Sequence, residues 1–269
     1  MVQEVRLQTA FEKARAEGRS ALIGYLPAGF PDHAVAVDAI LAMIDNGVDI
    51  VEVGLPYSDP VMDGPVIQRA TEAALAAGFR VRDGLRAVEA AAATGAPILT
   101  MTYWNLVERY GVERFSADLA AAGGAGLITP DLIPDEAGPW LAASDAHGLD
   151  RVFLVSPSST EARIASTAAA CRGFVYATSV MGVTGARSTT SSAAPALVER
   201  VRRLGPGTPV AVGLGVSNGE QAAEVGEFAD GVIVGSALVR CLLDAETPAA
   251  GVAAVARLSA ELAEGVRRH

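Results

Sequence analysis

Eight short runs of aliphatic residues alternate along the chain with Ala-rich stretches of helical character, and this rhythm limits the folds open to it. Strands rich in Val and Ile without strict alternation are typical of a parallel sheet covered by helices. The strands are predicted at 21–26, 48–54, 97–102, 125–129, 150–155, 173–177, 208–213 and 230–234. Eight such units predict an α/β protein of the closed (β/α)8 TIM-barrel type, with an open doubly wound sheet as the alternative.

Helical patterns fill the intervals between the predicted strands, and one more precedes the first strand. The amphipathic segment near 3–17 predicts an extra N-terminal helix. The remaining helices are predicted near 33–45, 65–77, 81–94, 112–122, 134–147, 161–170, 193–204, 218–226 and 248–265. A chain of 269 residues with 51% hydrophobic content can bury one large core, so residues 1–269 are expected to form a single barrel domain.

Net charge and hydropathy argue against two classes of function, nucleic-acid binding and insertion into a membrane. The formal net charge is -10, and the arginines are scattered along polar helix faces rather than gathered in a stripe, which argues against nucleic-acid binding. The first residues lack the basic-then-apolar order of a signal peptide, and no uncharged apolar run reaches membrane length. We therefore expect a cytoplasmic protein without a membrane segment.

The residue types available for chemistry are few. Lys13 is the only lysine, and it lies in the predicted N-terminal helix, so no lysine is available at a strand end to form a Schiff base. Three scattered histidines make a metal site improbable, and no metal ligand set is predicted. Cys171 and Cys241 lie in helical contexts where a buried free thiol is expected rather than a disulfide. Carboxylates, hydroxyls and backbone amides remain.

One stretch places a carboxylate in a strand and another in the loop after it. Glu52 lies in the second predicted strand, where Val48, Ile50 and Glu52 are expected to share one face, and Asp63 follows in a turn-rich loop. A carboxyl group buried there must either meet a desolvation cost or stay protonated at neutral pH. The pair therefore indicates an acid/base site. An arginine ion pair for Glu52 and a loop-capping role for Asp63 are the structural alternatives.

Glycines follow the last strands, where barrels of this type commonly bind phosphate. Gly213 and Gly215 follow the seventh strand, and Gly235 and Ser236 follow the eighth, at the start of a helix-like segment. Glycine allows close approach to an anion, and backbone N–H groups at a helix start attract it without any lysine. The polar segment 181–190 after the sixth strand has the length of a loop that covers a site.

These motifs, taken together, resemble the α subunit of tryptophan synthase along nearly the whole chain. The resemblance rests on VEVGLPYSDPVMDGP at 51–65, YATSVMGVTG at 176–185, GLGVS at 213–217 and VGSAL at 234–238. It implies a barrel that cleaves indole-3-glycerol phosphate to indole and glyceraldehyde 3-phosphate by retro-aldol chemistry, as part of tryptophan biosynthesis. It also implies no cofactor in this chain and a pyridoxal-phosphate β subunit as partner, in an α2β2 heterotetramer.

The resemblance assigns roles position by position. Glu52 is the implied catalytic glutamate, and Asp63 is the aspartate that holds the indole nitrogen. The residues expected around the glycerol phosphate are Tyr176, Thr184, Gly185, Gly213, Gly215, Gly235 and Ser236. An apolar slot for the indole ring is expected from Ile67, Met101 and Ile233. Tyr176 has simple core packing as an equal alternative.

The segment Ser58, Asp59 and Pro60 is the implied contact with the β subunit, and an ordinary turn is its alternative. The chain departs from the family pattern at Pro27, Phe30, Met62, Thr129 and Ile133, which bears on loop behaviour and partner contact more than on the chemistry. A stand-alone indole-releasing lyase and a noncatalytic activator of a β subunit are the rival functions. Indole-glycerol phosphate synthase fits less well, because its strand-end lysines are absent here.

Overall fold

A closed ring of parallel strands forms the centre of the molecule. The computed structural model describes residues 7–178, 193–213 and 215–268, in which nine strands pair in the order β5-β4-β3-β2-β1-β9-β8-β7-β6. The strands are β1 (Ala21–Pro27), β2 (Ile50–Gly54), β3 (Ile98–Met101), β4 (Gly126–Ile128), β5 (Asp150–Val152), β6 (Leu154–Val155), β7 (Val175–Thr178), β8 (Val210–Gly213) and β9 (Gly231–Val234). The predicted parallel barrel is confirmed.

The ring closes through the fifth predicted strand, which the structure divides in two at Phe153. Its first part, β5, pairs with β4, and its second part, β6, pairs with β7. The nine strands therefore correspond to the eight predicted ones, with the segment 150–155 joining the two ends of the sheet. This closure excludes the open doubly wound sheet.

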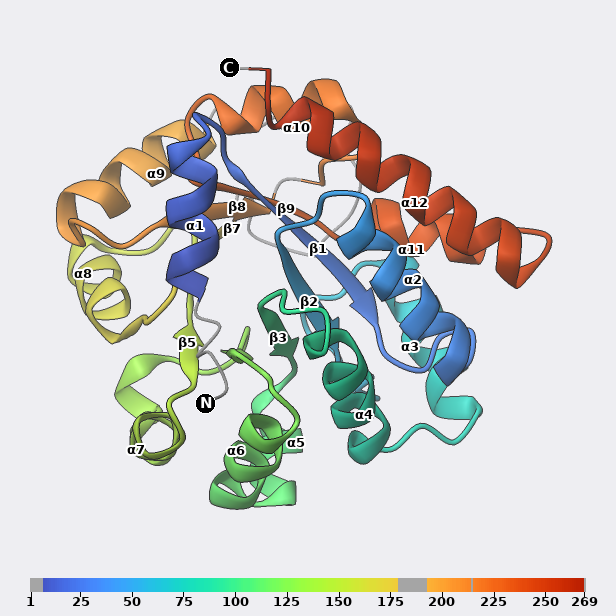
Figure 1. Ribbon diagram of the computed structural model, residues 1–269. Helices are drawn as coiled ribbons and strands as arrows, with labels where there is room; N and C mark the ends of the chain where they lie inside the picture. The colour runs from blue at the N-terminus through green and yellow to red at the C-terminus, as the bar shows by residue number, and fades with distance from the viewer. Residues whose placement is uncertain (1–6, 179–192, 214, 269) are drawn as a thin grey trace.

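Helices surround the strands (Figure 1). They are α1 (Leu7–Ala16), α2 (His33–Asp45), α3 (Pro65–Ala76), α4 (Val81–Ala92), α5 (Trp104–Tyr110), α6 (Val112–Ala121), α7 (Gly138–His147), α8 (Glu161–Ala170), α9 (Ala193–Leu204), α10 (Gly219–Gly226), α11 (Ser236–Leu243) and α12 (Pro248–Gly265). The predicted helix at 134–147 is a 3₁₀ turn, Pro134–Glu136, followed by α7. The long α12 packs along α2 and α11 (Figure 1).

The sequence analysis missed α5, for a reason that lies outside its own residues. Its N-cap, Tyr103, makes no side-chain capping bond. Instead the Asp131 carboxylate, from the loop after β4, accepts the Trp104 backbone N–H at 2.9 Å. Because this cap comes from a residue far along the chain, the local sequence shows no helix start.

The N-terminal helix closes one end of the barrel. Leu7, Phe11 and Ala14 of α1 are buried among residues of the barrel interior, and the rings of Phe11 and Phe174 lie 5.6 Å apart. The backbone N–H of Leu7 also donates to Asp150, at the start of β5. The extra N-terminal helix is therefore confirmed, and it forms the floor of the barrel.

Alternation along β2 directs Glu52 into the barrel. Ile50 belongs to the interior cluster, whereas Val51 and Val53 pack in the layer between strands and helices. Glu52 has the parity of Ile50 and faces inward. The expectation that Val48 shares this face was wrong, because Val48 precedes the strand and packs in the outer layer, where alternation no longer applies.

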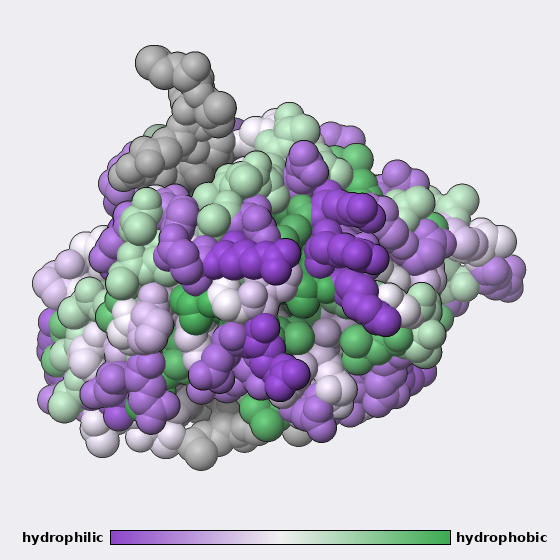
Figure 2. Space-filling view, turned by 90° about the horizontal axis from the view of Figure 1, so that it is seen from below, coloured by the Kyte–Doolittle hydropathy of each residue, from purple (hydrophilic) through white to green (hydrophobic). Residues whose placement is uncertain are grey.

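The outer surface is that of a helical shell. In the part of the chain that the structure describes, no helix combines the length and apolar character needed to cross a membrane. Figure 2, which views the molecule from below, shows hydrophilic residues interspersed with smaller hydrophobic areas. Such a mixed surface is normal for the outer faces of helices whose inner faces cover a sheet.

A buried hydroxyl directly after β4 leads to a stability prediction. Thr129 is 1% exposed, and among the described residues its Oγ1 has no hydrogen-bond partner. Thr129→Val removes this unpaired group at nearly constant shape. We expect the free energy of unfolding to rise by about 1 kcal/mol in urea titrations.

Thr100→Val is the matched control. Thr100 is also fully buried, on the neighbouring strand β3, but its hydroxyl donates to the carbonyl oxygen of Gly126 at 3.4 Å. The same substitution there removes a hydrogen bond, so we expect no gain in stability. Equal losses in both variants would contradict the assignment of an unpaired hydroxyl to Thr129.

Candidate functional site

Glu52 is a buried carboxyl group without a counter-charge. Its side chain is 1% exposed, and its Oε1 has no hydrogen-bond partner among the described residues. None of the ion pairs found between described residues involves Glu52, so the alternative of an arginine pair is not supported. Burial raises the pKa of Glu52 from 4.5 to about 8. The group therefore carries its proton at neutral pH and can donate it.

Two tyrosines flank the glutamate inside the barrel. Tyr25 is the register partner of Glu52 on β1, and Tyr176 lies on β7. Burial raises the pKa of both phenols well above 10, and the proximity of Glu52 raises both further. Tyr25 was not identified from the sequence, although its spacing from the inward-facing Ile23 was a usable signal.

Glycines at two strand ends provide the space that these tyrosines occupy. A Cβ on Gly54, the last residue of β2, would lie 2.3 Å from the hydroxyl oxygen of Tyr25. A Cβ on Gly213, the last residue of β8, would lie 2.7 Å from the hydroxyl oxygen of Tyr176. Both phenols therefore extend toward the carboxyl ends of the strands, where active sites form in this fold. Tyr176 also packs with the interior cluster, as its core alternative predicts, and its contact with the glycerol phosphate stays a prediction.

Asp63 lies in the loop after β2 and is partly buried. Its Oδ1 accepts a hydrogen bond of 2.9 Å from the hydroxyl of Tyr103. Burial raises the pKa of Asp63, and the Tyr103 hydrogen bond lowers it. The loop-capping alternative is not supported for helix α3, whose N-cap is Gly64 and has no side-chain capping bond.

The two carboxyl groups and the three tyrosines lie close enough to act on one another electrostatically. After burial, the largest influence on the Tyr25 phenol comes from Asp63, followed by Glu52, Tyr103 and Tyr176, and each raises its pKa. The two predicted carboxylates thus belong to one cluster at the carboxyl-terminal mouth of the barrel. Tyr103, like Tyr25, was missed by the sequence analysis, because nothing in the order Thr102-Tyr103-Trp104 shows that its hydroxyl reaches another loop.

The two segments predicted to bind phosphate follow the neighbouring strands β8 and β9. Gly213 pairs in register with Ile233, and Gly235 is the N-cap of α11, whose first residue is the buried Ser236. Among the described residues, no side chain caps this helix start, so its first backbone N–H groups are not satisfied by a capping bond. Gly215 follows the end of β8 by two residues. Thr184 and Gly185 lie outside the described residues.

The three residues expected to line an apolar slot come from three different elements. Ile233 is buried in the barrel interior, and Met101, at the end of β3, is partly exposed and packs against that interior. Ile67 lies near the start of α3 and belongs to the same buried cluster as Tyr25. That these three side chains form one slot for an indole ring stays a prediction.

The loop after β2 also carries the expected partner contact. Ser58 and Asp59 are exposed, Pro60 is partly exposed, and the Ser58 hydroxyl donates to the Asp59 carboxylate at 2.5 Å. Next to them Val61 is 73% exposed, and Ile133, in the loop after β4, is 39% exposed. These are the two large hydrophobic side chains most exposed in the described part of the chain, and both follow strand ends at the mouth.

The remaining departures from the family pattern are accommodated locally. Pro27 ends β1 opposite Gly54, and Phe30 is buried beside the cis peptide bond that it forms with Pro31. Met62 contributes its backbone N–H, which donates to the Tyr103 hydroxyl at 3.0 Å. These substitutions therefore leave the cluster of Glu52 and Asp63 intact.

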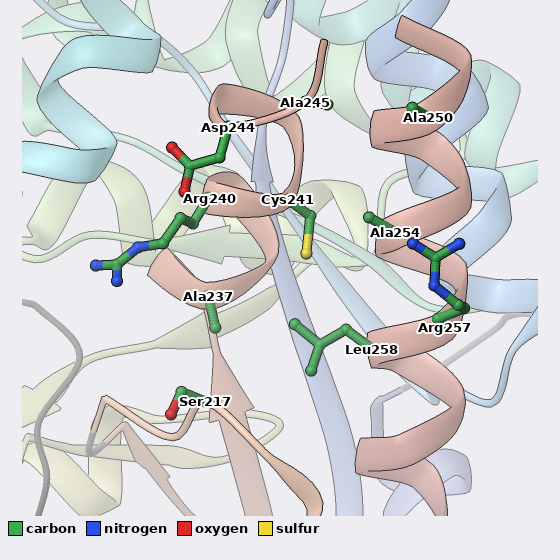
Figure 3. A pocket seen from close by; sticks show the side chains of 10 residues that line it. All are labelled: Ser217, Ala237, Arg240, Cys241, Asp244, Ala245, Ala250, Ala254, Arg257 and Leu258. Atoms are coloured by element: carbon green, nitrogen blue, oxygen red, sulfur yellow. The ribbon is translucent and has the colours of Figure 1, made fainter. Parts of the chain in front are cut away.

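A separate hollow lies between α11 and α12, outside the barrel (Figure 3). It measures about 450 Å³, and the side chains of Cys241 and Leu258 project into the space between the two helices, whereas the guanidinium of Arg240 extends away from α12. Cys241 and Cys171 are both free, as predicted, and burial raises the pKa of each thiol. This hollow contains neither carboxylate of the site.

The fold and the site define a class of protein: a (β/α)8-barrel enzyme whose site combines a protonated carboxyl group with a second carboxylate suited to acid–base chemistry. Within the described ranges, no three His, Cys, Asp or Glu side chains are grouped so that they would hold a metal ion.

Comparisons with known proteins identify the family. A sequence model of the family described as "Tryptophan synthase alpha chain" matches residues 11–267. The chain is 66% identical over 262 residues to the tryptophan synthase alpha chain of Salinispora tropica, a match covering 97% of this chain and 98% of that protein. It is 62% identical over 259 residues to the corresponding protein of Acidothermus cellulolyticus, with 96% of each covered.

The structural comparison agrees. The chain superposes with a TM-score of 0.93 on a structure of Mycobacterium tuberculosis tryptophan synthase, at 58% sequence identity, covering 99% of this chain and 100% of that chain. The chain belongs to the tryptophan synthase alpha chain family. It is a lyase of tryptophan biosynthesis.

Proposed function

We propose that the chain cleaves indole-3-glycerol phosphate with Glu52 as the general acid and Asp63 as the group that stabilises the indole ring. The observation that supports this most strongly is the burial of Glu52 without a partner, which keeps a proton on it at neutral pH. Breaking the bond between indole C3 and the glycerol chain requires a proton at C3, because only then can the ring leave. A buried carboxyl group with a pKa near 8 is suited to supply it.

The proposed reaction conserves protons. Glu52 protonates C3, and positive charge develops on the ring, where the Asp63 carboxylate accepts a hydrogen bond from the indole N–H. The carbon–carbon bond then breaks with its electron pair returning to the ring. The hydroxyl on the departing carbon loses its proton to the Glu52 carboxylate, directly or through a water molecule, as the aldehyde forms. Glu52 ends the cycle protonated.

The phosphate is assigned to the part of the mouth that follows β8 and β9, where β1 alone separates β9 from the strand of Glu52. We place it at the start of α11, where Gly235 and Ser236 present backbone N–H groups, beside Gly213 and Gly215. Tyr176 would contact the glycerol phosphate from β7, with Thr184 and Gly185 completing the set. Met101, Ile67 and Ile233 would hold the indole ring between this end and Asp63.

We infer that a β subunit docks on the mouth through Ser58, Asp59 and Pro60, in an α2β2 assembly in the cytoplasm. The exposure of Val61 and Ile133 around this segment supports an interface, since within the described ranges they are the large hydrophobic side chains that stand out as exposed. Alpha chains of this family carry no cofactor, and pyridoxal phosphate resides in the β subunit.

One assay tests the proposal and separates it from its rivals. Purified chain is incubated with indole-3-glycerol phosphate, and indole is measured with and without an added β subunit. We expect slow release of indole by the chain alone and much faster release with the partner. High turnover that the partner does not change would indicate a stand-alone lyase. No indole under either condition, with activation of the partner's serine chemistry, would indicate a noncatalytic activator.

A further inference from the structure

We propose that Tyr103 is a positioning residue whose hydroxyl fixes the Asp63 carboxylate toward the indole N–H. This inference rests on the proposed function, because it concerns how Asp63 is made ready for the role assigned to it. Neither the sequence motifs nor the resemblance assigned a role to Tyr103, which follows β3 and is the N-cap of α5.

The Tyr103 hydroxyl ties down two consecutive residues of the loop after β2. It donates to Asp63 Oδ1 at 2.9 Å and accepts the backbone N–H of Met62 at 3.0 Å. One bond orients the carboxylate, and the other holds the backbone that carries it. The Gln68 side chain adds a bond of 2.7 Å to the Asp63 carbonyl oxygen. The carboxylate is therefore held from its side chain and from both sides of its backbone.

Tyr103 is itself held firmly enough to act as a support. Its side chain is 5% exposed, and its ring centroid lies 5.2 Å from that of Tyr57 at an angle of 31°. The Tyr57 hydroxyl accepts a bond of 3.1 Å from Asn105. The next backbone N–H, that of Trp104, is bonded to Asp131. The start of α5 thus links the loops that follow β2 and β4, and its geometry is fixed from both.

The hydrogen bond also favours the ionised form that the reaction needs. Among the described residues, the titratable groups that act on Asp63 or are acted on by it are Tyr103 and Tyr25. Burial raises the pKa of Asp63, and the Tyr103 hydroxyl opposes that rise. Without this donor, the carboxylate would protonate at a higher pH and would lose its fixed direction.

Tyr103→Phe tests the proposal, because it removes the hydroxyl and retains the ring. We expect kcat to fall about 10- to 100-fold, with a smaller change in KM. In the pH profile, the acid limb should move to higher pH, because Asp63 then loses its charge at a higher pH. The alkaline limb, which we assign to Glu52, should stay in place.

Tyr110→Phe is the matched control. Tyr110 lies at the other end of α5, and its hydroxyl donates to the Asp118 carboxylate at 2.6 Å, away from the assigned site. This variant loses the same kind of bond and should keep the wild-type rate and pH profile. Thermal unfolding of both variants measures how far either change acts through stability.

A double-mutant cycle provides the second readout. In an Asp63→Asn background, Tyr103→Phe should cost little further activity, because the group that Tyr103 positions has already been replaced. Additive losses, or an acid limb that does not move, would overturn the proposal and leave Tyr103 a structural residue. If wild-type protein releases no indole, the proposed function itself fails, and that outcome is distinguishable from a failure of Tyr103 alone.

Discussion

Replacement of Glu52 by glutamine is expected to reduce indole release from indole-3-glycerol phosphate by about 10³-fold or more. Glutamine has nearly the same shape but cannot transfer a proton to C3. Since Glu52 is inside the barrel and 1% exposed, solvent cannot readily replace it as the acid. Single-turnover assays with excess β subunit measure the chemical step. A variant that retained near-normal turnover would exclude Glu52 as the general acid.

The same substitution should stabilise the protein at alkaline pH. Folding raises the pKa of Glu52 from 4.5 to about 8, so between these values the folded chain holds a proton that the unfolded chain has released. The free energy of unfolding therefore falls as pH rises through this window, by about 1.4 kcal/mol per pH unit from this group. Glu52→Gln removes that dependence, so we expect the free energy of unfolding of the variant to exceed that of wild type by on the order of 4 kcal/mol at pH 8.

Urea titrations at several pH values between 5 and 9 would measure this effect. Glu72→Gln is the control, because Glu72 lies on the exposed side of α3. Replacement of an exposed carboxylate should leave the free energy of unfolding of the variant equal to that of wild type. If Glu52→Gln lowers activity and raises stability, the buried carboxyl group destabilises the fold and is needed for the reaction. Parallel losses would instead indicate that Glu52 has a structural role.

Replacement of Asp63 by asparagine should lower kcat about 10²- to 10³-fold, with a smaller effect on folding. The amide can still meet the Tyr103 hydroxyl, but it carries no negative charge to balance the charge that develops on the protonated ring. The acid limb of the pH profile, which in wild type reflects protonation of Asp63, should disappear in the variant.

Asp118→Asn supplies the control for Asp63. Asp118 accepts a hydrogen bond from the hydroxyl of Tyr110, just as Asp63 accepts one from Tyr103. Its replacement changes the same chemical pair outside the assigned site, and we expect wild-type turnover. Full activity in the Asp63 variant would contradict the role in the reaction that is assigned to this residue.

The barrel could be predicted because its sequence signals are local. Each strand is a short aliphatic run, and each long helix has its own apolar periodicity or starting residue, so Thr160 and Asn218 cap α8 and α10 with their own side chains. The missed α5 shows the limit of such signals, since its cap, Asp131, comes from another loop. The division of the segment 150–155 at Phe153 likewise depends on two different neighbours, which no local pattern reports.

The two carboxylates of the candidate site could be selected from the sequence for the same reason, whereas the tyrosines around them could not. Glu52 and Asp63 are separated by a short loop, and their residue types already suggest chemistry. Tyr25 and Tyr103 reach the cluster from other strands, and tyrosines in apolar contexts are usually core residues. The role of their hydroxyl groups can be inferred only from the folded chain, which shows the groups that they contact. Val48 packs in the outer layer for a different reason, because it precedes β2 and strand alternation does not extend to it.

Helix α1, which closes one end of the barrel, determines the side from which molecules can reach the site. With Leu7, Phe11 and Ala14 of α1 packed into one end, exchange between the interior and its surroundings takes place at the opposite end. On the proposed function, substrate would enter and indole would leave at this open end, around which Val61 and Ile133 are exposed. A partner bound over that opening would receive the product as it leaves and would control the entry of the next substrate molecule.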